Sequence, residues 1–111
     1  MRAEKDASRT IFLVVPGSLD TLTGGYLYDR RILAELRRLG KSVEVVSLDE
    51  SFPMPTHAAL DDAASRFAAI PDKSLVVIDG LALAGLGELL PGLVERLDVI
   101  ALILNVDQLE K

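Results

Sequence analysis

The sequence predicts an α/β domain built on a parallel sheet, and two observations lead to that class. First, short apolar runs rich in β-branched residues, such as residues 10–15 (TIFLVV), are typical of strands covered on both faces. Second, these runs alternate with segments of helical periodicity, which indicates βαβ units with right-handed crossovers. Half of the residues are hydrophobic but only 5% are aromatic, a balance that suits aliphatic packing of helices on a sheet.

The first predicted helix follows a loop that contains two glycines. Its periodicity begins at Tyr26, and Gly40 is placed to end it in a left-handed conformation. Arg31 and Glu35 have the spacing of an i,i+4 ion pair. The predicted inward stripe contains Tyr28, Ile32, Leu33, Leu36 and Leu39, and the predicted solvent face contains Arg30, Arg31, Arg37 and Arg38.

A second strand and a second helix come next. Residues 42–48 alternate in polarity with Glu44 and Ser47 outward, which is typical of an edge strand. The helix runs from about Thr56, a residue suited to N-capping, to Ile70. The residues predicted to face inward are Leu60, Ala63, Ala64 and Phe67, and those predicted to face outward are Asp61, Asp62 and Arg66.

The last third of the chain contains two more predicted strands. Residues 74–79 (SLVVID) predict a buried strand, and residues 99–106 (VIALILNV) predict the last one. Residues 81–97 are helical in pattern with interruptions, so we expect a short irregular piece before a final helix. The interrupting residues are Gly85, Gly87, Pro91 and Gly92, and the final helix is expected to begin near Pro91.

Hydrophobicity also orders the strands in space. Residues 42–48 have the pattern of an edge strand, whereas residues 11–15 and 75–78 have that of central ones, so the predicted order is 2-1-3-4, numbered along the chain. This order describes a Rossmann-like three-layer αβα half-domain with a four-stranded parallel sheet. We expect a disordered segment over residues 1–9, a single domain over residues 10–106 and a polar tail over residues 107–111.

Composition and charge argue against several classes of protein. The formal net charge of -5 argues against a nucleic-acid partner, because nucleic-acid binders gather Lys and Arg to neutralise phosphates. With no cysteine and one histidine, disulfides, thiolate chemistry and a zinc site are not expected. No apolar run reaches the roughly 18–20 residues of a membrane span, and the polar start lacks the apolar core of a signal peptide. We therefore expect a cytoplasmic protein with no metal, no cofactor and no membrane span.

The predicted strand order contains a switch point, where the connections from the first and third strands leave in opposite directions. Ligands of open α/β sheets bind at such a point, outside the carboxyl ends of the strands. Two glycines there precede a helix, whose free N–H groups and positive dipole end favour phosphate or carboxylate. The predicted phosphate-binding residues are therefore Thr23, Gly24, Gly25, Asp79 and Gly80.

This glycine loop matches neither the Walker pattern nor the dinucleotide pattern G-x-G-x-x-G. The alternative is that the glycines only permit a tight entry into the helix.

Residues 12–56 (FLVVPGSLDTLTGGYLYDRRILAELRRLGKSVEVVSLDESFPMPT) and 75–83 (LVVIDGLAL) carry a resemblance to a known family. They resemble the N-terminal half of a bacterial glycosyltransferase of the two-Rossmann-domain (GT-B) class, in the large retaining family that uses nucleotide sugars. The resemblance implies that this domain mainly binds the acceptor, while its glycine loop approaches the donor's diphosphate. The residues that match the family's loop and the turn facing it are Gly24, Gly25, Asp79 and Gly80.

Two departures from the family pattern bear on activity. The sequence lacks the C-terminal domain that carries most nucleotide-sugar contacts in this family, and residues 104–106 replace the histidine that the family tends to place beyond the last strand. We therefore expect a truncated or engineered N-terminal half, with no catalytic residue, that binds a nucleotide sugar or an acceptor weakly. The alternative is an engineered or minimal α/β scaffold that self-associates and binds no ligand.

The last predicted strand also indicates a partner. Its apolar pattern contains neither lysine nor proline within Val99–Val106, and as the last strand it would present an unpaired edge, a template for pairing with another chain. We expect a homo-oligomer, most simply a two-fold dimer in which this strand pairs with its copy in antiparallel fashion.

Other interpretations have less support in the residues. Asp79 at a strand end resembles the phospho-acceptor of receiver domains, but acidic residues that would hold Mg²⁺ do not follow the first strand. The stretch TLTGG resembles the phosphate loop of flavodoxins, but the aromatic residues that sandwich a flavin are missing. His57 falls in the first turn of the second helix and is expected to be an exposed surface residue.

Overall fold

The computed structural model describes residues 10–17 and 24–103, so the segments predicted as a disordered start and a polar tail lie outside it. Its centre is a four-stranded parallel sheet in the order β2-β1-β3-β4. The strands are β1 (Thr10–Pro16), β2 (Ser42–Leu48), β3 (Leu75–Asp79) and β4 (Asp98–Leu102). The predicted Rossmann-like α/β layout is therefore confirmed, and the switch point lies between β1 and β3.

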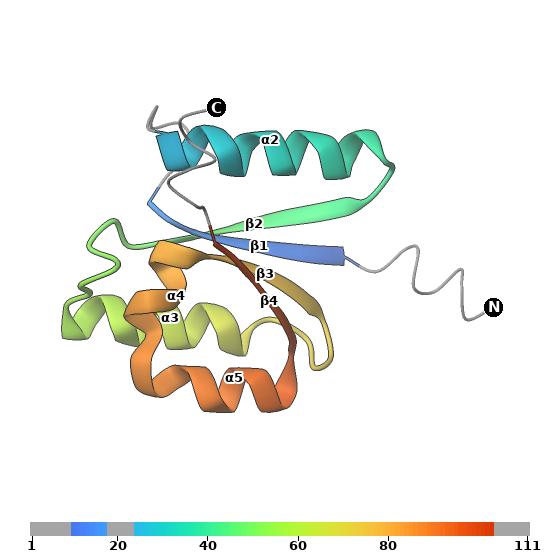
Figure 1. Cartoon of the computed structure of the whole chain (residues 1–111). Helices are drawn as coiled ribbons and strands as arrows, with labels where there is room; N and C mark the ends of the chain where they lie inside the picture. The colour runs from blue at the N-terminus through green and yellow to red at the C-terminus, as the bar shows by residue number, and fades with distance from the viewer. Residues whose placement is uncertain (1–9, 18–23, 104–111) are drawn as a thin grey trace.

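Helices cover the two faces of the sheet unequally (Figure 1). Of the described helices, α2 (Gly24–Arg38) lies on one face, and a run of shorter helices lies on the other. This run consists of α3 (His57–Ala68), α4 (Gly80–Leu86), the 3-10 helix η1 (Gly87–Leu89) and α5 (Leu90–Arg96). The chain thus forms the three layers expected of an αβα domain.

The core is divided into two clusters by the alternation of side chains along β1. Every second residue of β1 is buried toward α2, and the intervening residues are buried toward α3 and α4. The first set is Ile11, Leu13 and Val15, and the second is Phe12 and Val14. Leu33 and Leu36 of α2 pack on the first set. Both faces of β1 are covered, and its residues are apolar and buried from Ile11 to Pro16.

The C-terminal end of helix α2 agrees with the prediction in one respect and differs in another. Gly40 has φ 85°, the expected left-handed conformation, and its N–H donates to the carbonyl of Arg37. Leu39, predicted to face inward, is 58% exposed. The helix ends at Arg38, so Leu39 lies in the turn that follows and points away from the inward stripe.

The inward face of α2 also differs from the predicted stripe. The helix begins at Gly24, ahead of the predicted start at Tyr26. Leu33 and Leu36 pack on the sheet as predicted, and Asp29, which the predicted stripe omits, is buried with them at 1% exposure. Asp29 precedes these two leucines by one and two helical turns, so it lies on the same face of the helix.

Surface ion pairs within the helices follow helical spacing. Glu35 pairs with Arg38 rather than with the predicted partner Arg31. In α3, Asp62 and Arg66 form an i,i+4 pair of 2.7 Å. An exposed i,i+4 pair such as Asp62–Arg66 stabilises a helix by about 0.3–0.5 kcal/mol, so surface pairs contribute little to the fold.

Helix α3 begins with the predicted cap. The hydroxyl oxygen of Thr56 accepts a hydrogen bond from the N–H of Ala59 at 3.1 Å. Ala63 and Phe67 are buried as predicted, but Ala64 is exposed. Ala59 takes the inward position in its place, because positions four residues apart share one face of a helix.

The predicted interruptions between β3 and β4 are present, and α4, η1 and α5 follow one another as short pieces. Gly85 in α4 permits a close approach of the loop that follows β2. A Cβ atom at Gly85 would lie 2.6 Å from the ring of Phe52 and 2.8 Å from the carbonyl oxygen of Pro53. The Phe52–Pro53 peptide bond is cis.

The two edges of the sheet differ in polarity. β2 exposes Glu44 and Ser47, as predicted for an edge strand. At the other edge β4 pairs with β3, and Ile100 and Ile103 are 50% and 66% exposed. Residues 104–106 of the predicted last strand lie outside the described part of the chain. Apart from Asp98 at its start, the edge formed by β4 is therefore the more apolar one.

Candidate functional site

The candidate site lies at the carboxyl ends of β1 and β3, where the chain leaves the sheet in opposite directions. On the β3 side, Asp79 is the last residue of the strand and Gly80 the first of α4. On the other side, Gly24 and Gly25 are the first two residues of α2. Thr23, the remaining residue predicted for this site, lies outside the described part of the chain.

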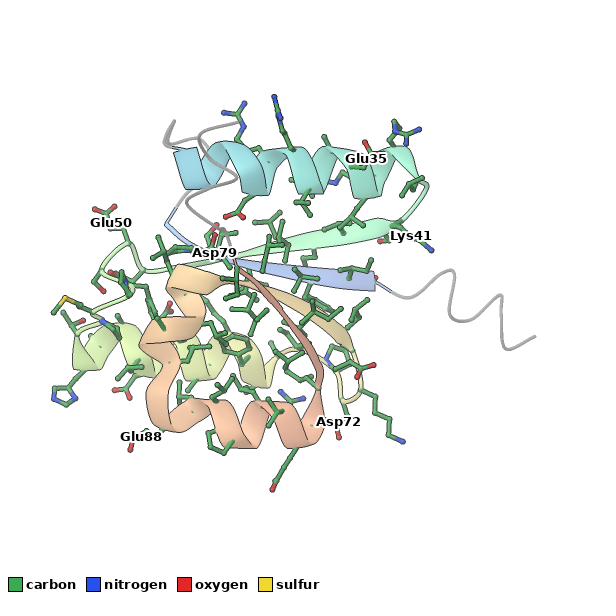
Figure 2. All side chains as sticks on the ribbon, in the orientation of Figure 1. Glu35, Lys41, Glu50, Asp72, Asp79 and Glu88 are labelled. Atoms are coloured by element: carbon green, nitrogen blue, oxygen red, sulfur yellow. The ribbon has the colours of Figure 1, made fainter. Side chains whose placement is uncertain are left out.

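Asp79 points from the end of β3 toward the face that α2 covers. It follows Val77 by two residues, so both side chains lie on the same face of the strand, and Val77 packs in the cluster under α2. One carboxylate oxygen, Oδ1, accepts a hydrogen bond of 2.7 Å from the N–H of Leu81 and so caps helix α4. Asp79 is only 8% exposed. Figure 2 shows it between α2 and the first turn of α4.

Asp29 approaches Asp79 from the opposite layer. It lies on the inward face of α2, and its side chain hydrogen-bonds that of Asp79. Sequence reasoning assigned no role to Asp29, although its spacing to Leu33 and Leu36 was a signal that could have placed it on the buried face. Two carboxyl groups, from a helix and from a strand end, therefore meet at the switch point.

The two carboxyl groups hold a proton at neutral pH. The pKa of Asp29 is raised to about 8, first by burial, then by the side-chain hydrogen bond with Asp79 and by charge repulsion from Asp79. A protonated Asp29 can donate to the Asp79 carboxylate, and the pair then carries a single negative charge. The Oδ2 atom of Asp29 is buried and has no hydrogen-bond partner in the structure.

The glycines of α2 lie close to this pair along the helix. Gly25 precedes Asp29 by one turn on the same face, a rise of about 6 Å along the helix axis. The first backbone N–H groups of a helix have no partner within the helix, and they are donors for an anion or a carbonyl. The switch point thus combines backbone donors with a carboxyl oxygen that can accept a hydrogen bond.

Gly80 has a packing role that the prediction did not include. A Cβ atom there would lie 3.2 Å from the backbone oxygen of Leu102 and 3.2 Å from the side chain of Ile103. Gly80 therefore lets the end of β4 approach the start of α4, next to Asp79. Its place beside the site was predicted, and its contacts are with the protein itself.

A shallow depression of about 390 Å³ lies elsewhere, at the carboxyl end of β2 and the start of α3. Its polar lining includes Asp49, Asp62 and Arg66, and Arg66 is already paired with Asp62. His57 begins α3 and is exposed, as predicted. The depression therefore offers carboxylates without a free cation, and it lacks the buried, unpartnered atom found at the switch point.

Residues 10–17 and 24–103 contain neither a metal-binding cluster nor a membrane-spanning helix. No three histidine, cysteine or acidic side chains there gather into a group that could hold a metal ion. None of the described helices has the length and apolarity needed to cross a membrane.

The carboxyl pair and the free backbone N–H groups of α2 therefore mark the ends of β1 and β3 as the candidate site. Comparison of the chain with protein-family models, with curated proteins and with solved structures finds no match.

Proposed function

We propose that this chain is the N-terminal, acceptor-side domain of a glycosyltransferase that uses a nucleotide sugar. One observation carries the proposal: the glycine pair that opens α2 and the turn after β3 lie at the same end of the sheet, at its switch point. The resemblance of the sequence to the GT-B family assigns the diphosphate-facing loop to Gly24 and Gly25 and the turn facing it to Asp79 and Gly80. The strand order and the position of these residues support that assignment.

The domain acts in this proposal as a binding module rather than as a complete catalyst. A departing diphosphate needs cationic or metal stabilisation. The described side chains that meet at the switch point are the carboxyl groups of Asp29 and Asp79, and the other donors are backbone amides of α2. Such a set can orient a ligand but does not neutralise a diphosphate. We therefore expect binding without sugar transfer.

The test is native mass spectrometry of the protein with uridine and guanosine diphosphate sugars. The proposal predicts a mass increase of one ligand, which is lost in Gly24→Val because a β-branched side chain blocks the approach to the helix amides. Gly92→Val is the matched control, since a Cβ at Gly92 meets nothing within 4 Å. Absence of any bound nucleotide sugar, or equal binding by both variants, would contradict the proposal.

A second candidate function is self-association through β4, and the polarity of the sheet edges favours it. Between Val99 and Ile103 the strand and its continuation contain no charged residue, and Ile100 is half exposed. The opposite edge carries the charged residue Glu44, a feature that protects edge strands from pairing. A two-fold axis beside β4 would pair it with its copy in antiparallel fashion and extend the sheet across the dimer. In this form the chain is a self-associating scaffold.

A further inference from the structure

We propose that the free edge of β2 is a docking site for an extended peptide segment of a partner protein that carries lysine or arginine side chains. The segment adds to the sheet as a further strand next to β2, and its basic side chains enter the depression between β2 and α3. The inference goes beyond the proposed function, because it concerns neither the switch point nor the β4 edge.

The edge of β2 has backbone groups that point away from the sheet. The carbonyl oxygen of Leu48 accepts a hydrogen bond from the N–H of Gly17, which follows β1, so the backbone groups of Leu48 face β1. This direction alternates along a strand. The backbone groups of Val43, Val45 and Ser47 therefore point outward, past the edge of the sheet.

The amino half of this edge is covered, and the carboxyl half is open. Arg37 of α2 donates a hydrogen bond of 3.1 Å to the outward carbonyl oxygen of Val43. Within the described part of the chain, no hydrogen bond reaches the outward backbone groups of Val45 or Ser47. The carboxyl half of β2 therefore keeps donors and acceptors that an added strand can use.

The depression of about 390 Å³ lies beside this open half. Its lining includes residues 47–49 at the end of β2 and, from α3, Ala59, Asp62 and Arg66. These α3 residues recur every three or four positions, so they form one side of the helix. When a peptide adds to a sheet, main-chain hydrogen bonds give affinity and pockets for alternate side chains give specificity. The edge of β2 supplies the first, and the depression supplies the second.

The charge around this edge selects the partner. From Glu44 to Arg66 the chain contains five acidic residues and one basic residue, a net charge of -4 out of -5 for the whole chain. Glu44, Asp49 and Glu50 are exposed. The basic residue, Arg66, is already paired with Asp62. A second copy of β2 would therefore be repelled, and so would a nucleic acid, whereas a strand with basic side chains is attracted.

Asp49 is the carboxylate that a basic side chain in the depression would meet. It follows β2 directly and lines the depression. Its Oδ1 atom accepts a hydrogen bond of 2.8 Å from the N–H of Ser51, which orients the side chain and lowers the pKa of the carboxyl group. No basic side chain of the described residues pairs with it. Asp49 is therefore a charged and correctly placed partner for a lysine or an arginine.

The experiment is fluorescence anisotropy of the full chain with a labelled, end-blocked nonapeptide in which lysine alternates with valine. A matched peptide has glutamate in place of lysine. The proposal predicts saturable binding of the lysine peptide at neutral pH. The glutamate peptide should bind at least about tenfold more weakly, because like charges then face each other along the edge. Added salt should weaken the binding of the lysine peptide.

Two variants of Ser47 separate strand addition from general attraction between charges. Ser47→Pro removes an outward N–H and places the proline ring at the open edge, where a strand tolerates it. It should weaken the binding of the lysine peptide at least about tenfold. Ser47→Ala keeps the N–H and should bind within about twofold of the original chain. Circular dichroism checks that both variants remain folded.

Two further variants test the place of the charge. Asp49→Asn keeps the Oδ1 acceptor for Ser51 and should weaken the binding of the lysine peptide about twofold to fivefold, the effect of one exposed charge pair. Glu95→Gln removes an exposed acidic charge from α5 and should leave the binding unchanged. These two variants and the two peptides keep the test decisive if Ser47→Pro does not fold.

The proposal is contradicted if the lysine peptide does not bind, if the glutamate peptide binds equally well, or if Asp49→Asn has no effect. Equal binding by Ser47→Pro and Ser47→Ala, both folded, would show attraction between charges without strand addition and would overturn it too. The peptide should still bind Ile100→Lys, because β4 is the opposite edge of the sheet. Loss of binding in that variant would place the peptide at β4 and not at β2.

Discussion

The carboxyl group of Asp29 in helix α2 is hydrogen-bonded to that of Asp79 at the end of β3, and both residues are nearly fully buried. Two ionised carboxylates would repel each other in such a place, so the contact requires a proton. The pKa of Asp29, raised to about 8 by burial and by Asp79, supplies that proton throughout the neutral range. The pair therefore joins the α2 layer to the sheet at the point where a ligand is expected.

The first prediction concerns the dependence of stability on pH. The folded chain keeps the Asp29 proton up to a pH of about 8, whereas the unfolded chain loses it near the ordinary value of 3.8. Between these values the folded state binds more protons than the unfolded state, so the contribution of Asp29 to the free energy of unfolding falls as pH rises. Above about 8 both states have lost the proton and this contribution no longer changes.

Asp29→Asn isolates this effect, since its side chain does not titrate. We expect the variant to gain stability relative to the original chain as pH rises from 5 to 8.5, by at least about 1 kcal/mol, since one pKa unit of difference between the folded and unfolded states corresponds to about 1.4 kcal/mol. Urea denaturation of both chains at the two pH values measures the difference. A difference that stays constant with pH would show that Asp29 does not hold its proton in the folded state.

The second prediction concerns the close contact at Gly85. A Cβ atom there would lie 2.6 Å from the Phe52 ring and 2.8 Å from the Pro53 carbonyl oxygen, too close for either group to stay in place. Gly85→Ala should lower the free energy of unfolding by about 1–3 kcal/mol, as overpacking does. Gly92→Ala, where a Cβ meets open space, should be neutral or gain up to about 1 kcal/mol from helix propensity. Thermal unfolding of the two variants tests the contrast, and equal midpoints would contradict it.

A third prediction concerns Arg96, which joins α5 to the end of α3. Its guanidinium donates to the carbonyl oxygens of Phe67 and Ile70, each at 2.6 Å. The Ile70 carbonyl lies beyond the end of α3, and the Phe67 carbonyl also accepts from the N–H of Ile70, so Arg96→Ala, which removes both guanidinium bonds, should cost about 1–3 kcal/mol. Arg66→Ala removes only an exposed pair with Asp62 and should cost no more than about 0.5 kcal/mol. Chemical denaturation that ranks the two arginines in the opposite order would refute the assignment.

The fourth prediction concerns the apolar edge. If β4 pairs with its copy, Ile100→Lys places a charge at the centre of the interface and should convert the dimer to a monomer. Glu44→Lys changes a charge on the opposite edge and should leave the dimer intact. Light scattering coupled to size-exclusion chromatography at high micromolar concentration gives the mass of each. If the original chain is a monomer at that concentration, the proposal of self-association through β4 is contradicted.

Much of the fold could be predicted because its signals are local. A strand covered on both faces must be apolar at every position, which marks β1, and an edge strand alternates, which marks β2. Those two patterns were enough to order the sheet. Helix ends could also be predicted where one residue type favours them, as Thr56 does at the start of α3 and Gly40 after the end of α2.

The site could be predicted only in outline, because its second carboxyl group depends on a tertiary contact. An aspartate in an arginine-rich helix has the composition of a solvated face. Its burial follows from the register of α2 against the sheet and from Asp79, a partner far along the sequence. Leu39 is exposed for a different reason, because α2 ends at Arg38 and Leu39 lies in the turn that follows.

The measurement that tests the central claim most directly is a pH titration of the Asp29 carboxyl carbon by NMR in the intact chain. A carboxyl pair that shares one proton predicts a midpoint near 8 for this carbon. The midpoint should fall when Asp79→Asn removes the neighbouring charge, because that charge raises the pKa of Asp29. A midpoint near 4 would mean that Asp29 is ionised at neutral pH, and the paired, proton-holding site at the ends of β1 and β3 would then not exist.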